Sequence, residues 1–160
     1  MKKIKLKTEF TVFPSIKDVP TDVQNLMEHA KNARLKAYSP YSQFNVGAAL
    51  LLENGEIVSG SNQENASYPS GLCAERTAIF AAGSNFPDSK IFKIAITAKS
   101  QNKKTDSPIP PCGACRQVIS EYEIKQEAPI EIYFMGEVGK VVKSDSIANM
   151  LPWIFDRSML

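Results

Sequence analysis

The residues best suited to chemistry in this sequence are its three cysteines, Cys73, Cys112 and Cys115. Cys112 and Cys115 form a Cys-x-x-Cys pair inside the stretch PIPPCGAC, and Cys73 opens the stretch CAERTAIFAAG. Both stretches are predicted helix starts, where the helix dipole and free N–H groups favour thiolate over thiol. Three thiolates brought together would bind a borderline-soft cation such as Zn²⁺ and leave a fourth tetrahedral position for water. The pattern therefore predicts a catalytic zinc site rather than a closed structural one.

A carboxylate accompanies the first cysteine, because Glu75 follows Cys73 by two positions within the same predicted first turn. A carboxylate beside a metal-activated water can move protons between that water and a substrate. The Cys-x-x-Cys pair alone would also suit a thioredoxin-like redox centre or two buried small hydrophobic residues. Cys-x-Glu followed by Pro-Cys-x-x-Cys, however, is closely related to the established signature of zinc deaminases.

The bulk composition narrows the class of protein. The 160 residues suffice for one ordinary domain, and 43% hydrophobic and 22% charged residues are typical of a soluble globular protein. A net charge of +2 is too small to predict a nucleic-acid-binding surface by itself. No apolar run approaches the roughly 20 residues of a membrane span, and the stretch MKKIKLKTEF lacks the apolar core of a signal peptide. We therefore expect a cytoplasmic protein that binds neither membranes nor nucleic acid.

Helices and strands alternate along the chain and must position these groups. Amphipathic spacing predicts a helix over 22–37, capped by Thr21, with the only histidine, His29, at its surface. A hairpin over 46–52 and 56–61 follows. The remaining expected elements are a helix from near Cys73 to near Gly83, a strand over 91–98, a helix over 113–122, strands over 130–135 and 138–143, and a final helix opened by Ser144. This order predicts an α/β sandwich around a mixed sheet of five strands.

Five blocks in the correct order resemble the cytidine deaminase family, in its small homotetrameric type that acts on free nucleosides. The blocks are SPYSQFNVGAAL, SNQENASY, CAERTA, PCGACRQV and LPWIF, and together they span most of the chain. The resemblance implies a three-layer α/β/α sandwich around a mixed five-stranded sheet. Residues 21–160 would form the catalytic domain and residues 1–20 an N-terminal extension. The resemblance also implies a homotetramer whose sites are shared between subunits.

The implied reaction is the zinc-dependent hydrolytic deamination of cytidine and 2′-deoxycytidine, with release of ammonia, in pyrimidine salvage. In this resemblance Cys73, Cys112 and Cys115 hold the Zn²⁺, and Glu75 is the proton shuttle. Arg76 resembles the residue that hydrogen-bonds to the ligand sulfurs. Such bonds would restore the Lewis acidity that three thiolates take from the metal.

Other blocks supply the expected substrate contacts. Phe44 resembles the aromatic residue that packs on the pyrimidine, and Asn62 and Glu64 resemble the pair that holds the ribose hydroxyls. Side chains at i and i+2 of an extended segment point the same way, which suits gripping a sugar. The remaining expected roles are a backbone N–H of Ala74 for the base carbonyl, Tyr68 and Phe155 for a neighbouring subunit's site, and Gln117 for support of the metal loop.

Four other functions compete with cytidine deamination. A deaminase of another cytosine-containing compound, such as a nucleoside antibiotic, would share the metal site, but Asn62 and Glu64 favour the plain nucleoside. An editing deaminase needs a basic, aromatic-lined channel for a nucleic-acid strand, and dense basic residues occur only over 2–7. Many editing relatives also have histidine where this chain has Cys73. A non-catalytic zinc module does not need Glu75, and a redox role for the Cys-x-x-Cys pair leaves both Cys73 and Glu75 without a role.

Overall fold

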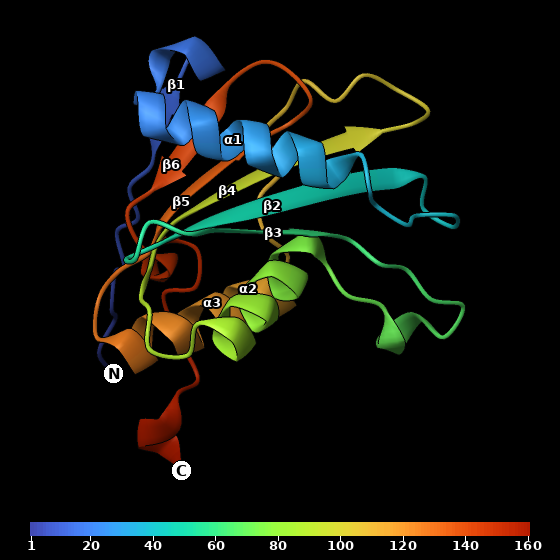
Figure 1. Ribbon diagram of the computed structural model, residues 1–160. Helices are drawn as coiled ribbons and strands as arrows, with labels where there is room; N and C mark the ends of the chain where they lie inside the picture. The colour runs from blue at the N-terminus through green and yellow to red at the C-terminus, as the bar shows by residue number, and fades with distance from the viewer.

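The computed structural model describes residues 1–160 and consists of one sheet with helices on both of its faces (Figure 1). Helix α1 (Thr21–Arg34) covers one face, and helices α2 (Ala74–Asn85) and α3 (Gly113–Gln126) cover the other. The predicted three-layer α/β/α sandwich is therefore confirmed. No helix combines the length and the apolar character needed to cross a membrane.

The sheet contains six strands in the order β1-β6-β5-β4-β2-β3. Their bounds are β1 Thr11–Phe13, β2 Phe44–Leu52, β3 Ile57–Ser61, β4 Ile91–Ser100, β5 Glu131–Met135 and β6 Val141–Ser144. Neighbouring strands are antiparallel except β4 and β5, which are parallel. A parallel pair needs a crossover connection, and α3 lies within the one between β4 and β5. The sheet is thus mixed, as predicted.

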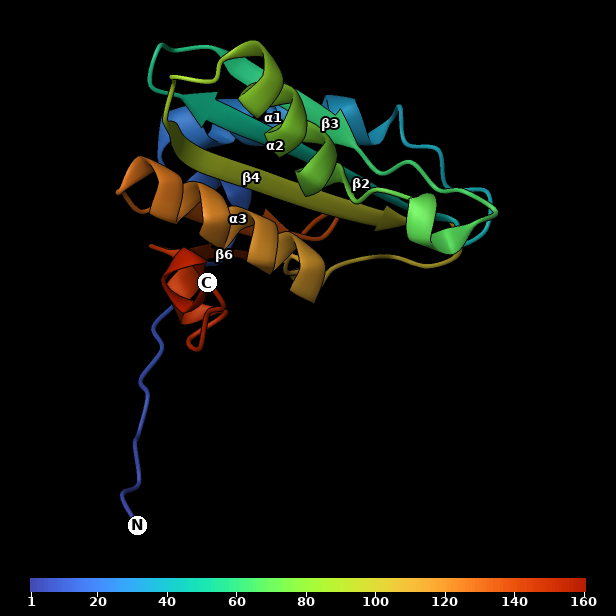
Figure 2. The same cartoon turned by 90° about the horizontal axis from the view of Figure 1, so that it is seen from below.

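The sixth strand corrects the expected count of five. Strand β1 pairs with β6 at the edge of the sheet, with Val12 opposite Val142. The residues before it are exposed, and Figure 2 shows them leaving the body of the molecule. One contact ties this segment to the C-terminal part of the chain, where the backbone N–H of Glu9 donates to Oδ1 of Asn149 at 3.2 Å.

Two apolar cores hold the three layers together, one on each face of the sheet. Side chains alternate along β2, so Ala48 and Leu50 pack toward α2 and α3 while Ala49 packs toward α1. The two cores bury the apolar stripes of the helices on their own sides, and this burial fixes the starts of α2 and α3 over one end of the sheet.

Gly47 allows α1 to pack directly against β2. A Cβ at this position would lie 2.0 Å from the carbonyl oxygen of Ala30 and 2.5 Å from the backbone nitrogen of Arg34. We expect Gly47→Ala to lower the free energy of unfolding by about 3 kcal/mol, because the helix must move off the sheet. Urea denaturation measures the change. Gly113→Ala is the control, since an added Cβ there meets nothing within 4 Å, and equal stability of the two variants would contradict the packing argument.

Several predicted element ends differ from the observed ones. Thr21 is the first residue of α1 rather than its cap, because Pro20 takes the N-cap position and makes no side-chain bond. Helix α2 continues past Gly83 to Asn85. Gly83 instead gives room to Tyr122, whose hydroxyl oxygen would lie 2.2 Å from an added Cβ.

The expected final helix is wrong. Residues Ile147–Asn149 form a single 3-10 turn, in which the Ser146 hydroxyl accepts from the N–H of Ala148. The chain then enters an irregular segment that includes Pro152, which has no N–H to continue a helix. A capping serine therefore does begin a turn here, but the turn does not extend into an α-helix.

Candidate active site

The three cysteine sulfurs meet where α2 and α3 begin. Cys73 is the N-cap of α2, Cys112 is the N-cap of α3, and Cys115 lies in the first turn of α3. The Sγ of Cys112 lies 3.7 Å from that of Cys73 and 3.5 Å from that of Cys115. All three sulfurs lie within 4.8 Å of one another, and none takes part in a disulfide.

The sulfur cluster fits one Zn²⁺. Zinc–sulfur bonds of about 2.3 Å in a tetrahedral site place the sulfurs about 3.8 Å apart, close to the observed separations. A disulfide would require about 2.05 Å. Cys115 is fully buried whereas Cys112 is exposed, so the cluster is closed on one side and reachable on the other.

Arg76 supports the sulfurs from the first turn of α2. Its Nη2 lies 3.7 Å from the Sγ of Cys73 and 3.4 Å from the carbonyl oxygen of Gly71, while its buried Nε has no partner. A hydrogen bond from the Cys115 thiol, aided by the Arg76 guanidinium, lowers the pKa of Cys73 to about 5 although desolvation opposes it. The same contact with Cys73 raises the pKa of Arg76. The lowered pKa favours the thiolate form of Cys73, which is the form that binds a metal.

The carboxyl group of Glu75 is buried beside the sulfurs, with 4% of the residue exposed. Desolvation raises the pKa of this carboxyl to about 7, and the negative charge of Cys73 acts in the same direction. A carboxyl group whose pKa lies near neutrality can both accept and donate a proton during a reaction. The arrangement suits proton transfer next to a metal site.

A cavity of about 690 Å³ opens at the cluster, a volume within the usual range for small-molecule sites. The residues expected at the site that line it are Phe44, Asn62, Glu64, Tyr68, Cys73, Glu75, Arg76 and Cys112. The apolar part of its wall includes Val46, Leu72, Ile96, Ile109 and Pro110, which sequence analysis did not single out. Most of these apolar residues lie inside or next to the sequence blocks that resemble the family. That proximity is the sequence signal that could have identified them as part of the cavity wall.

Asn62 and Glu64 are held in the cavity wall by backbone groups. The side-chain amide of Asn62 accepts from the N–H of Val46 at 2.8 Å and donates to the carbonyl of Phe44 at 2.9 Å. The carboxylate of Glu64 accepts from the backbone N–H groups of residues 41–42. An amide and a carboxylate each offer more bonds than these, so both side chains keep capacity for a ligand.

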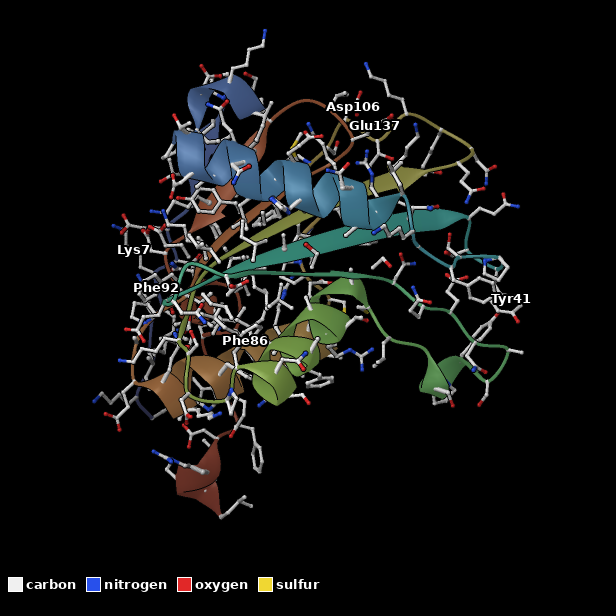
Figure 3. All side chains as sticks on the ribbon, in the orientation of Figure 1. Lys7, Tyr41, Phe86, Phe92, Asp106 and Glu137 are labelled. Atoms are coloured by element: carbon white, nitrogen blue, oxygen red, sulfur yellow. The ribbon has the colours of Figure 1, made fainter.

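Tyr68 stands at the rim of the cavity with 75% of its surface exposed. Its ring centroid lies 5.9 Å from that of Tyr41. Figure 3 shows Tyr41 at the edge of the molecule, beside the loop between β3 and α2 that carries Tyr68. The two rings form an exposed aromatic edge on one side of the cavity.

Four of the expected site residues do not line the cavity, namely Cys115, Ala74, Gln117 and Phe155. Cys115 is fully buried in the first turn of α3. Ala74 is the first residue of α2 and its side chain is fully buried, although N–H groups in a first turn have no acceptor within the helix. The Nε2 of Gln117 donates to the carbonyl oxygen of Phe155 at 2.8 Å. Gln117 thus binds the C-terminal segment, and Phe155 is 58% exposed. His29 is exposed on α1, on the opposite face of the sheet.

Comparisons with known proteins agree on one family. The family described as "Cytidine and deoxycytidylate deaminase zinc-binding region" matches residues 20–128. A cytidine deaminase of Sporosarcina psychrophila is 42% identical over 87% of this chain and 95% of its own length. A cytidine deaminase of Halalkalibacterium halodurans is 40% identical over 84% of this chain and 94% of its own length. The crystal structure of cytidine deaminase from Burkholderia pseudomallei superposes with a TM-score of 0.70 at 40% identity, covering 82% of this chain and 97% of that one.

Proposed function

Because this chain belongs to the cytidine and deoxycytidylate deaminase family, we propose that its cavity binds cytidine and 2′-deoxycytidine and that Glu75 moves the protons of the reaction. The protein is a zinc enzyme that deaminates cytidine, consuming water and forming uridine and ammonia. One observation supports the assignment of Glu75 above all. Its buried carboxyl lies in the wall of the same cavity as the sulfur cluster and the candidate nucleoside contacts.

The metal ligands in this proposal are Cys73, Cys112 and Cys115. When bound, Zn²⁺ supplies a Lewis acid that promotes the ionisation of water at neutral pH. Arg76 donates toward the Sγ of Cys73, and a charge-assisted bond of this kind draws electron density from the sulfur. Arg76 would therefore offset part of the excess negative charge of three thiolates.

Glu75 would carry each proton over a short path. Its carboxylate takes the proton lost by the attacking water and delivers it to N3 of the pyrimidine as the C4–O bond forms. Glu75 would then take the second proton of the former water from the hydroxyl now on C4 and deliver it to the amino nitrogen. The C4–N bond breaks as the C4 carbonyl forms, so nitrogen leaves as ammonia and N3 keeps the first proton. Phe44 would pack on the base, and the apolar side chains of Val46 and Ile96 in the cavity wall limit the entry of other water.

Purified protein provides the direct test. It should convert cytidine to uridine, followed by the change in ultraviolet absorbance, and bind about one zinc ion per chain, measured by elemental analysis. Turnover of a nucleoside antibiotic without turnover of cytidine would favour the close alternative. Turnover of an oligonucleotide alone would favour an editing enzyme.

We predict that Glu64→Gln raises the KM for cytidine by about tenfold, with a smaller change in kcat. Loss of a hydrogen bond to a charged group typically costs about 1.5–3 kcal/mol, and the ribose lies away from the reacting C4. Steady-state kinetics separates the two constants. Glu56→Gln is the charge-matched control, because Glu56 is exposed on the hairpin between β2 and β3. An unchanged KM in Glu64→Gln would remove Glu64 from the set of ribose contacts.

We also propose a homotetramer in which neighbouring subunits share sites. Large aromatic side chains remain exposed near the cavity rim and in the C-terminal segment, namely Tyr68 at 75%, Trp153 at 72% and Phe155 at 58%. Neighbouring subunits that pack against these side chains would remove them from water. Four chains of 17.7 kDa give about 71 kDa, which light scattering would measure. A mass of a single chain at micromolar concentration would contradict the proposal.

Two further proposals concern the cellular location of the protein and the extent of its catalytic domain. We place the enzyme in the cytoplasm, because a reducing compartment keeps the three thiols free for metal binding. We place its reaction in pyrimidine salvage, because it would convert one free pyrimidine nucleoside into another. We also propose residues 21–160 as the catalytic domain and residues 1–20 as an extension. The match to the family begins at residue 20, which supports this boundary.

A further inference from the structure

The hydroxyl of Ser42 lies between two of the proposed nucleoside contacts. It donates to Oε1 of Glu64 and accepts from the backbone N–H of Phe44 at 3.1 Å. Ser42 also lines the cavity. The proposed reaction gives Ser42 no role. Its hydroxyl oxygen nevertheless connects Glu64, which is expected to hold the ribose, with the backbone of Phe44, which is expected to pack on the base.

The Ser42 hydroxyl occupies one of the acceptor positions of the Glu64 carboxylate. The Oε2 of Glu64 accepts from the N–H of Tyr41 at 2.9 Å and from the N–H of Ser42 at 3.2 Å. An ionised carboxylate offers about four acceptor positions, two on each oxygen. The Ser42 hydroxyl takes one of the two positions on Oε1, and one remains for a ligand. The hydroxyl thus determines which way the remaining acceptor position points.

The same bonds favour the ionised form of Glu64. Desolvation would raise the pKa of Glu64, but the bonds from the Ser42 hydroxyl and from the N–H groups of Tyr41 and Ser42 lower it below its ordinary value. A charged acceptor forms stronger hydrogen bonds to sugar hydroxyls than a neutral one.

Hydrogen bonds brace the backbone next to Ser42. Gln43, the next residue, has a φ of 53°, a left-handed conformation that is uncommon outside glycine. Bonds hold the turn on both sides, since the N–H of Gln43 donates to Ser39 at 3.1 Å and its carbonyl accepts from Gln101 at 2.9 Å. These backbone bonds, together with the two bonds of the hydroxyl itself, define where the Ser42 hydroxyl lies relative to Glu64 and Phe44.

We propose that Ser42 is a positioning residue for nucleoside binding, acting chiefly through Glu64 on the ribose hydroxyls. Its hydroxyl holds the Glu64 carboxylate in one rotamer, and its bond to the N–H of Phe44 ties that rotamer to the start of β2. The inference rests on the proposed role of Glu64 as a ribose contact. Ser42 is not assigned any part in proton transfer.

Steady-state kinetics on Ser42→Ala tests the proposal. We expect the KM for cytidine to rise about tenfold while kcat changes less than about twofold, because binding and not chemistry is affected. With 2′,3′-dideoxycytidine, which lacks both ring hydroxyls, the KM of the variant should stay within about twofold of wild type. Ser42→Thr keeps a hydroxyl and should restore most of the affinity. Ser70→Ala is the matched control, since Ser70 is exposed near the same rim and its hydroxyl reaches only Ser67 at 3.5 Å.

Glu64→Gln separates failure of this inference from failure of the proposed function. A raised KM in Glu64→Gln together with a normal KM in Ser42→Ala overturns the role of Ser42 alone. A normal KM in Glu64→Gln overturns the ribose contact on which the inference depends. An equal penalty on cytidine and 2′,3′-dideoxycytidine in Ser42→Ala overturns action through the ribose. In the double variant, the Ser42 change should add less than about twofold to the effect of Glu64→Gln.

Discussion

Replacing Glu75 with glutamine is expected to lower kcat for cytidine by about 10⁴-fold while zinc content stays at about one ion per chain. Glutamine keeps the size of the side chain but cannot carry a proton between water and the pyrimidine. Both proposed transfers use this one carboxyl, so the loss should lie at the upper end of the range for general acid–base catalysis. The change adds no charge to a buried site, and the fold should survive it.

Two measurements make the Glu75 result interpretable. Elemental analysis of Glu75→Gln should find zinc as in the wild type, because all three sulfur ligands remain. Glu121→Gln is the matched control, since Glu121 is exposed on α3 and should keep full activity. If Glu75→Gln retained more than about a tenth of the wild-type kcat, the proposed proton shuttle would have to be another group.

Replacing Cys112 with serine should remove both zinc and activity. We expect bound zinc to fall below about a tenth of an ion per chain, with turnover reduced at least about 10³-fold, because two thiolates remain where three are needed for an open tetrahedral site. Cys112 is the best ligand for this test because it is exposed. Cys115 is fully buried, so its substitution would disturb packing as well as the metal.

The neighbouring Gly113→Ala serves as the control for Cys112→Ser. It alters the same loop, but its added Cβ meets nothing within 4 Å, so zinc and activity should be kept. Zinc at wild-type levels in Cys112→Ser would show that Cys112 is not a required ligand. Treating the wild type with a chelator should reproduce the loss of turnover, and added Zn²⁺ should restore it.

The metal cluster was predictable because its signal is local. Each cysteine position could be recognised as a helix start from the few residues around it, and a helix start favours the thiolate form that binds a metal. The position of Glu75 beside the sulfurs was predictable for the same reason, since this residue lies two positions from Cys73. The three sulfurs do meet within 4.8 Å, as a shared metal ion requires.

Features that depend on contacts between residues far apart in the sequence were not predictable from such local signals. Strand β1 has only three residues, and its place in the sheet comes from pairing with β6, far along the chain. The expected final helix failed because the turn capped by Ser146 is followed by an irregular segment with Pro152. The bond between the Ser42 hydroxyl and Glu64 also joins positions separated by 22 residues. Sequence spacing says nothing about such contacts.

By itself, the sequence determined the alternation of helices and strands, the chemistry of the metal ligands and the choice of Glu75 as the proposed proton carrier, since periodicity and short motifs are local properties. Only the tertiary structure decided which backbone groups hold Asn62 and Glu64, where Gln117 and Phe155 meet, and which apolar side chains enclose the cavity. The physical reason is that these contacts form between segments brought together by burial of the two cores on either side of the sheet.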